Sequence, residues 1–262
     1  MKLQDGIAWG VESGVGRIVL SRPEKANALN FALLSALAQA IDELIALAPR
    51  VVLISAQGPV FSAGGDISWM LAAGENFHAE VDRTLQVVNP AMHRLVSAPI
   101  PVVSAVSGPL GGAGIALALC ADFVLGATSM KLRTGYAALG VTPDLGVTYF
   151  LSRRIGTMRA RQWLMLSDAI DAEECLKAGV VDALYPADEL ASAVEALVAR
   201  LARSAPGSVG GIKKLCNALQ AGDLLVQLDL EREILSGCAR STDFQEGVRA
   251  FSEKRAPLFT GS

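Results

Sequence analysis

The chain has 262 residues, a formal net charge of −3 and a composition of 52% apolar and 19% charged residues. This length is enough to bury a sizeable core without disulfides or metals. The charge balance and the lack of a Lys/Arg block exclude nucleic acid as the main expected partner. Apolar runs stay shorter than the roughly 18 residues of a membrane span, so no membrane partner is expected either.

The N-terminal segment MKLQDGIAWG has no basic stretch followed by an apolar one, which predicts a cytoplasmic protein without a signal peptide. The two histidines lie away from the glycine-rich motifs, which disfavours a histidine metal site or a Ser-His-Asp triad. The cysteines are widely spaced and form no C-x-x-C pair. Each is therefore predicted to be a small, buried or partly buried thiol: Cys120, Cys175, Cys216 and Cys238.

Short β-branched runs alternate with helical patterns in the first part of the chain. The expected elements are strands at 16–21, 50–55, 100–106 and 121–127, a helix at 31–48 and further helices through Val96. Strands separated by helices predict parallel pairing in an α/β core. The runs VVLIS and PVVSAV are continuously apolar, which indicates strands covered on both faces.

Beyond about residue 155 the pattern becomes helical almost throughout. Asp171 and Glu174 form a predicted capping pair, and Gly179 is the expected stop of that helix. Thr242 opens a T-x-x-Q sequence, which predicts a second helix start. These helices are expected to cover the core, a partner subunit or both.

Two glycine-rich stretches follow consecutive expected strands: FSAGGD at 61–66 and SGPLGGAGIAL at 107–117. A strand, a glycine turn and a helix start together aim unpaired backbone N–H groups at an anion. Either stretch alone is weak evidence, because glycines also permit close packing of strand and helix, and the spacing is not that of a nucleotide loop. Two such turns at neighbouring strand ends can converge, and one amide from each would then form an oxyanion hole.

Five motifs together resemble the enoyl-CoA hydratase/isomerase, or crotonase, superfamily: SRPEKANALN (21–30), GPVFSAGGDI (58–67), SGPLGGAGIALALCAD (107–122), LGVTPDLGVTYFLSRRIG (139–156) and FQEGVRAFSEKRAPLF (244–259). The resemblance implies an α/β fold in which residues 1–200 form a spiral of ββα repeats carrying the active site. It implies that residues 201–262 form a helical region for oligomerisation, giving a homotrimer or a dimer of trimers. It also implies acyl-CoA thioester substrates and no metal or redox cofactor, with coenzyme A entering as part of the substrate.

The same resemblance assigns the oxyanion amides to Ala63 and Ala113. Removal of an α proton places negative charge on the thioester oxygen, and fixed N–H donors stabilise that charge as it develops. Small residues around these positions allow the ligand to approach closely.

The two glutamates of family hydratases are missing, since Ala116 and Tyr136 occupy the matching positions. Asp144 in VTPDLG matches an acid found in isomerase branches of the family, and one carboxylate can move a proton between two carbons. Its apolar neighbours are expected to raise its pKa. The alternative role of Asp144 is to cap the helical stretch that follows it. Tyr136 is expected to line the pocket, with a hydrogen bond to the substrate as the alternative.

The remaining candidate residues concern the coenzyme and the local structure. Asp66 is expected to cap the helix that starts at Ile67, and Asp122 to be structural. A lysine can supply a point charge for a phosphate group of the coenzyme. The simpler alternatives are that each candidate lysine is an ordinary surface residue and that packing alone explains Phe251. The resemblance assigns the coenzyme to Lys25, Ala26, Asp66, Ile67, Phe251 and Lys254.

The leading hypothesis is an enoyl-CoA isomerase that uses Asp144 as its single base. Alternatives are a hydratase that activates water through Asp144 or Tyr136, and a catalytically weak acyl-CoA-binding member of the family. Dehalogenation with Asp144 as nucleophile is a further, less favoured possibility.

Overall fold

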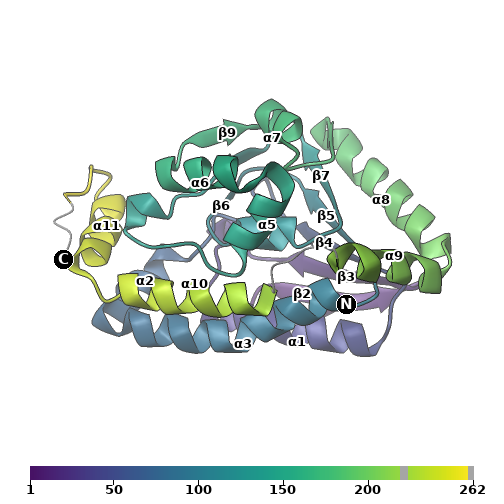
Figure 1. The fold of residues 1–262 in the computed structure, drawn as a ribbon, viewed down its shortest axis with the longest axis horizontal. Coiled ribbons are helices and arrows are strands. Elements are labelled where there is room, and N and C mark those ends of the chain that lie inside the picture. Colours follow the sequence, from purple (N-terminus) through teal and green to yellow (C-terminus); the bar gives the residue numbers. More distant parts are fainter. Residues whose placement is uncertain (219–223, 259–262) are drawn as a thin grey trace.

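The computed structural model describes residues 1–218 and 224–258, and a twisted seven-stranded sheet lies at its centre (Figure 1). Strands β1 to β3 pair antiparallel, whereas β3 and the strands beyond it pair parallel. The sheet order is β1 (Lys2–Gln4), β2 (Ile7–Glu12), β3 (Val15–Leu20), β4 (Val51–Ala56), β5 (Val102–Val106), β7 (Phe123–Ala127) and β10 (Ala183–Tyr185). A three-stranded sheet contains β6 (Leu110–Gly111), β8 (Lys131–Arg133) and β9 (Ala169–Asp171).

Helices cover both faces of the large sheet. The helices of the described residues are α1 (Phe31–Ala46), α2 (Ile67–Ala73), α3 (Phe77–Ser97), α4 (Gly114–Leu119), α5 (Val147–Ile155), α6 (Thr157–Leu166), α7 (Ala172–Ala178), α8 (Ala187–Arg203), α9 (Pro206–Ala218), α10 (Leu224–Cys238) and α11 (Thr242–Ser252). Single 3-10 turns are η1 (Pro23–Lys25), η2 (Gly74–Asn76) and η3 (Ala137–Leu139).

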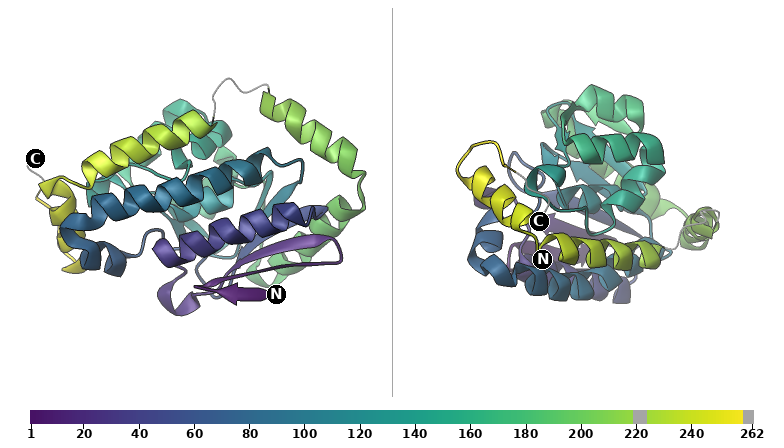
Figure 2. Two further views of the ribbon diagram at one scale, coloured as in Figure 1. Left: turned by 90° about the horizontal axis from the view of Figure 1, so that it is seen from below. Right: turned by 60° about the vertical axis from the view of Figure 1, so that its left-hand side comes forward.

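The predicted coverage of the sheet on both faces is confirmed. Val52 and Ile54 of β4 belong to the main core with α1 and α3, while the alternate residues Val51 and Leu53 pack with α8 on the other face. The period of two along a strand explains this division, and strands buried on both faces are mostly apolar, with the buried Ser104 of β5 as an exception. Figure 2 shows α10 beside α3 and α3 beside α1, so the C-terminal layer lies directly on the helices of the core.

Most of the predicted helix ends are confirmed. The side chain of Asp171 accepts from the N–H of Glu174 at 2.8 Å, and Gly179 ends that helix in the left-handed region. The cap predicted at Thr242 is wrong by one residue, because Ser241 Oγ accepts from the N–H of Phe244. The division at residue 200 stays a prediction, although α8 packs on the sheet and continues to Arg203.

Two further predictions concern the burial of the cysteines and the presence of membrane-spanning helices. Cys120 and Cys175 are buried and Cys238 is partly buried, but Cys216 is exposed, so the prediction of four buried or partly buried thiols is wrong for that residue. Cys216 lies on α9 and lines a groove with Val96 and Arg153, where it stays open to solvent. None of the described helices combines the length and the apolar character needed to cross a bilayer.

Candidate active site

The two glycine turns meet, as their positions after neighbouring strands predict. Ser62 and Leu110 form a parallel bridge, and the N–H of Gly111 donates to the carbonyl of Ser62 at 2.9 Å. A Cβ built on Gly64, whose φ is +87°, would lie 2.9 Å from the carbonyl oxygen of Gly111. The close contact of the two turns therefore requires glycine at this position.

Gly65 and Ala113 each have a free amide at this junction. Within the described residues neither N–H donates a hydrogen bond, and a Cβ on Gly112 would lie only 3.8 Å from the nitrogen of Gly65. The N–H of Ala63, in contrast, donates to the carbonyl of Ala26 at 2.9 Å. The N–H of Ala63, the predicted oxyanion donor, is therefore not free in this structure, whereas the N–H of Gly65 is.

The bridge between Leu29 and Gly65 explains which amide stays free. Leu29 donates to the carbonyl of Gly64, and the N–H of Asp66 donates to the carbonyl of Leu29 at 2.8 Å. In a parallel pair the residue between these two contacts turns its own N–H to the opposite side. For Gly65 that side is the cavity, which it helps to line.

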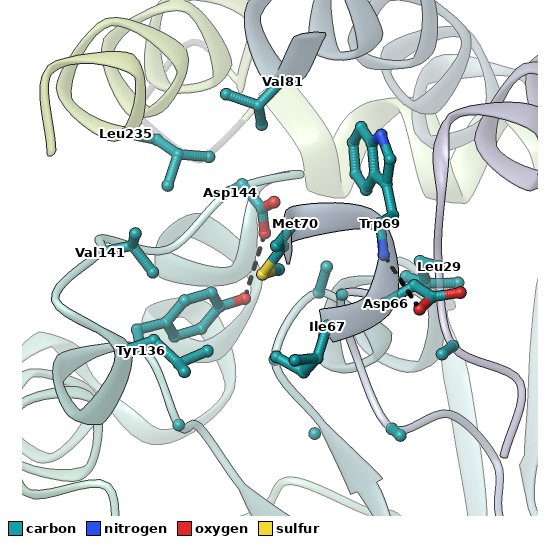
Figure 3. A pocket seen from close by; sticks show the side chains of 18 of the residues that line it. Leu29, Asp66, Ile67, Trp69, Met70, Val81, Tyr136, Val141, Asp144 and Leu235 are labelled. Carbon is teal, nitrogen blue, oxygen red and sulfur yellow. Dashed lines mark hydrogen bonds between the residues drawn. The ribbon is translucent and has the colours of Figure 1, made fainter. Parts of the chain in front are cut away.

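A cavity of about 530 Å³ opens in front of these amides (Figure 3). Its wall is mostly apolar and comes from segments far apart in the sequence. Trp69 packs edge-on against Phe77, and Phe77 stacks on Phe244, both at 5.1 Å between ring centroids. The indole N–H of Trp69 donates to Glu80 Oε2 at 2.6 Å, which fixes the orientation of the ring.

Sequence reasoning missed this aromatic wall. Residues 74–83 look polar as a whole, yet Phe77 and Val81 are both buried and line the cavity. Their spacing of four residues places them on one face of α3. This spacing is the one local feature of the sequence that could have identified them as buried. Leu235 and Phe244 reach the cavity from α10 and α11, and no local pattern predicts that arrival.

Asp144 lies in the turn between η3 and α5 and points into the cavity from the side opposite Asp66 and Trp69 (Figure 3). Its Oδ1 accepts a hydrogen bond from the phenol of Tyr136 at 3.2 Å. Desolvation, and then the negative charge of Glu231, raise the pKa of Asp144 to about 7, although the bond from Tyr136 acts in the opposite direction. The expected direction of the shift is confirmed.

The alternative role of Asp144 as a helix cap is not seen. Helix α5 is preceded by Gly146, and no side chain of the capping residue itself closes this end. Instead Glu231 of α10 accepts from the N–H groups of Gly146 and Thr148, at 2.6 and 3.1 Å, and from the hydroxyl of Thr148. Sequence reasoning did not single out Glu231, because 83 residues separate it from Thr148.

Tyr136 lines the cavity as expected, but its hydroxyl has a defined partner. The side chain is 6% exposed and its O–H donates to Asp144. Burial and the neighbouring carboxylate of Asp144 raise the pKa of the phenol further above its ordinary value. The residue is therefore a neutral donor, and its bond goes to the candidate base.

Asp66 caps α2, as predicted. Its Oδ1 accepts from the N–H groups of Ser68 and Trp69, at 3.0 and 3.4 Å, and its Oδ2 lies 3.5 Å from Arg22 Nη2. Asp66 and Ile67 also line the cavity. The structural role expected for Asp122 is confirmed in the same way, since it accepts from the N–H of Val102 and from Lys213 Nζ.

The candidate coenzyme residues lie at the edge of the cavity or outside it. Lys25 is exposed on η1 and lines the cavity, whereas the next residue, Ala26, is not among the residues that line it. Phe251 also lines it and is 59% exposed, so packing against the described residues does not account for this side chain. Lys254 is exposed just after α11 and does not contact the cavity. A role for these residues in binding coenzyme A stays a prediction.

The chain is similar to named relatives and to solved structures over nearly its whole length. It is 34% identical to a probable enoyl-CoA hydratase of Rhodobacter capsulatus, with 97% of this chain and 98% of that protein covered. It is 33% identical to a trans-2-decenoyl-acyl-carrier-protein isomerase of Streptococcus mutans, with the same coverage. The crystal structure of an enoyl-CoA hydratase from Mycobacterium avium subsp. paratuberculosis superposes with a TM-score of 0.85 at 30% identity, covering 97% of this chain and 98% of that one.

The family model described as enoyl-CoA hydratase/isomerase matches residues 10–262. The match spans both glycine turns, the turn that carries Asp144 and the C-terminal helices. The chain therefore belongs to the enoyl-CoA hydratase/isomerase, or crotonase, superfamily of enzymes that act on acyl-CoA thioesters.

Proposed function

We propose that the protein is an enoyl-CoA isomerase in which Asp144 shifts a double bond along the acyl chain. The observation that carries this proposal is that one carboxylate in the cavity wall is free to act as a base. Of the described residues that line it, only Asp66 and Asp144 are acidic, and Asp66 is committed to capping α2. Asp144 has a pKa near 7, so it can both accept and return a proton at neutral pH.

The proposed reaction needs one base and one anion site. The carboxylate of Asp144 removes a proton from C2 of a 3-enoyl thioester, and the electrons of that C–H bond pass into a dienolate. The N–H groups of Gly65 and Ala113 hold the oxygen of this dienolate, and one such donor typically lowers a barrier by about 3–4 kcal/mol. Asp144 then returns the proton to C4, which gives the 2-enoyl thioester with no net change in atoms. No metal or redox cofactor takes part in the proposed steps.

The cavity wall favours an apolar acyl group. Trp69, Phe77 and Phe244 form one continuous aromatic surface, and Val81 and Leu235 extend it toward Asp144 (Figure 3). Burying an apolar chain against this wall stabilises the complex by about 25 cal/mol for each Å² removed from water. The decenoyl group in the name of the Streptococcus mutans relative has this apolar character.

Enoyl-CoA hydration is the second candidate, because the Rhodobacter capsulatus relative bears the name of a hydratase. The two reactions differ in whether solvent oxygen enters the product. We would incubate the protein with 3-enoyl-CoA and 2-enoyl-CoA in heavy-oxygen water, follow the masses, and run Asp144→Asn in parallel. Interconversion without a mass change, lost in the variant, is the expected result.

Other outcomes of this experiment are also decisive. Incorporation of solvent oxygen that depends on Asp144 would establish a hydratase and overturn the isomerase. No turnover of any substrate, together with tight binding of acyl-CoA, would favour a catalytically weak binding protein.

We also propose that the protein assembles as a homotrimer or as a dimer of trimers. The C-terminal helices support this, because they expose large apolar side chains on their outer faces. Ile212 and Leu215 of α9 are 61% and 70% exposed, and Val226 of α10 is 65% exposed. Exposed apolar patches of this kind mark contact surfaces, and sedimentation analysis of the purified protein tests the oligomeric state.

A further inference from the structure

The turn that carries Asp144 has a strained backbone. Leu145 and Gly146 both lie in the left-handed region, with φ of +53° and +86°. Glycine adopts this conformation freely, but leucine does so only at a cost. Because Leu145 is fully buried, its position depends on the surrounding contacts. A strained turn persists only where neighbouring groups hold it.

Glu231 supplies the hydrogen bonds that hold this turn. Its side chain is on α10, and the residue is 4% exposed. Its Oε2 accepts from Gly146 at 2.6 Å, while Oε1 accepts from both the N–H and the hydroxyl of Thr148. Gln227, one turn earlier on α10, donates to the Thr148 hydroxyl at 2.6 Å. The donors satisfy a buried carboxylate, and the carboxylate satisfies the N-terminal amides of α5.

We propose that Glu231 is a positioning residue, which through Gly146 and Thr148 holds the Asp144 turn in the geometry needed for proton transfer. This inference rests on the proposed role of Asp144 as the base. Asp144 is two residues before Gly146, so a displacement of that amide would move the carboxylate relative to the amides of Gly65 and Ala113. A misplacement of about 1 Å is enough to lower a rate by 10²-fold.

The charge of Glu231 has a second effect on the same residue. The charged or titratable groups that act on Asp144 are Tyr136 from the start of η3 and Glu231 from α10. The negative charge of Glu231 raises the pKa of Asp144, whereas the hydrogen bond from Tyr136 lowers it. Arg232, the neighbour of Glu231 on α10, is paired with Asp82 of α3. Removal of the charge at position 231 should therefore lower the pKa of Asp144.

The test compares Glu231→Gln with Glu233→Gln, which makes the same chemical change at an exposed site of the same helix. The amide in Glu231→Gln keeps the shape of the side chain but removes the charge and one acceptor. We expect kcat to fall between about 10- and 100-fold with little change in KM. We also expect the lower limb of the pH profile to move to lower pH. Glu233→Gln should match the wild-type protein in both respects.

The outcomes separate this inference from the proposed function. An unchanged kcat and pH limb in Glu231→Gln overturns the positioning role, and so does a fall in kcat without any movement of the limb. If Asp144→Asn keeps full isomerase activity, the proposed base itself is wrong. Should Glu231→Gln fail to fold, Thr148→Val removes one donor from Glu231 and keeps its carboxylate. A smaller fall in kcat with little change in KM is then expected, while the pH limb should stay in place because the charge of Glu231 remains, and an unchanged kcat overturns the inference.

Discussion

The phenol of Tyr136 donates to Oδ1 of Asp144 at 3.2 Å, so the candidate base and a neutral donor form one unit in the cavity wall. Eight residues separate the two side chains, and the intervening η3 turn brings them together. A hydrogen bond to a carboxylate favours its charged form, while burial of the same carboxylate disfavours it. These two opposed effects set the pH range in which Asp144 can act as a base.

Tyr136→Phe should move the lower limb of the pH profile to higher pH. The substitution removes the hydrogen bond that lowers the pKa of Asp144 and leaves the ring that lines the cavity. Less of the base is then ionised at pH 7, and we expect kcat/KM there to fall a few-fold and to recover at higher pH. The measurement is kcat/KM from pH 5 to 9, with Tyr149→Phe as control, because the Tyr149 hydroxyl bonds to Arg153 on an exposed face. A loss that does not vary with pH would mean that the phenol acts on the substrate.

Asp144→Asn should remove activity and stabilise the fold at alkaline pH. The folded-state pKa of Asp144 is about 7, above its ordinary value of 3.8, so the folded state binds the proton more tightly than the unfolded state does. This contribution to stability is fully present below about pH 4 and is lost as the pH rises through 7. The free energy of unfolding of the variant should therefore match that of the wild-type protein near pH 4 and exceed it by about 1–3 kcal/mol at pH 8. Urea unfolding at both pH values measures this, and equal stabilities at pH 8 would contradict the raised pKa.

Ala113→Pro should remove one of the two proposed oxyanion donors. Ala113 has φ of −60° at the start of α4, a backbone that proline adopts, and no described group accepts its N–H. We expect kcat to fall by about 10²- to 10³-fold, as is typical for the loss of one such donor. Thr157→Pro is the matched control, since it also follows a glycine of positive φ at a helix start but lies outside the cavity. Similar activity losses in both variants would show that proline lowers the activity by disturbing the fold and not by removing an oxyanion donor.

Lys25→Ala should weaken the binding of the coenzyme portion without affecting the chemistry. Lys25 is an exposed cation at the edge of the cavity, and a lost contact with phosphate of about 1.4 kcal/mol corresponds to a tenfold rise in KM. An acyl-pantetheine thioester lacks the nucleotide phosphates, so its KM should be the same in both proteins. The exposed Lys177 on α7 provides the control substitution. An equal rise in KM for both substrates would place Lys25 against another part of the ligand.

The parts of the site that sequence predicted are those set by local rules. Strands β4 and β5 are adjacent and parallel, so the glycine turns that follow them had to meet at one edge of the sheet. The caps at Asp66 and Asp171 followed from residue type and position. The acid at position 144 was recognised from the family motif, and the apolar sequence around it gave the direction of its pKa shift.

The parts that sequence missed depend on contacts between distant segments. The amide of Ala63 is occupied by the carbonyl of Ala26, and nothing in the glycine motif itself indicates that partner. Likewise Phe244 completes the aromatic wall, and Glu231 caps α5, only because α10 and α11 pack back over the core. A one-residue error at Thr242 has a simpler cause, since serine and threonine are adjacent and either can cap a helix.

The hydrogen bond from Gly146 to Glu231 can form only late in the synthesis of the chain. A ribosome adds residues from the N-terminus, so the sheet, both glycine turns and Asp144 itself emerge well before α10. Until α10 folds back, the strained turn at Leu145 lacks its partner carboxylate. A nascent chain that ends before residue 224 would thus contain both glycine turns and Asp144, yet it would lack the carboxylate that accepts from the N–H groups of Gly146 and Thr148. The last helices to be made therefore supply both the cap of the Asp144 turn and part of the cavity wall.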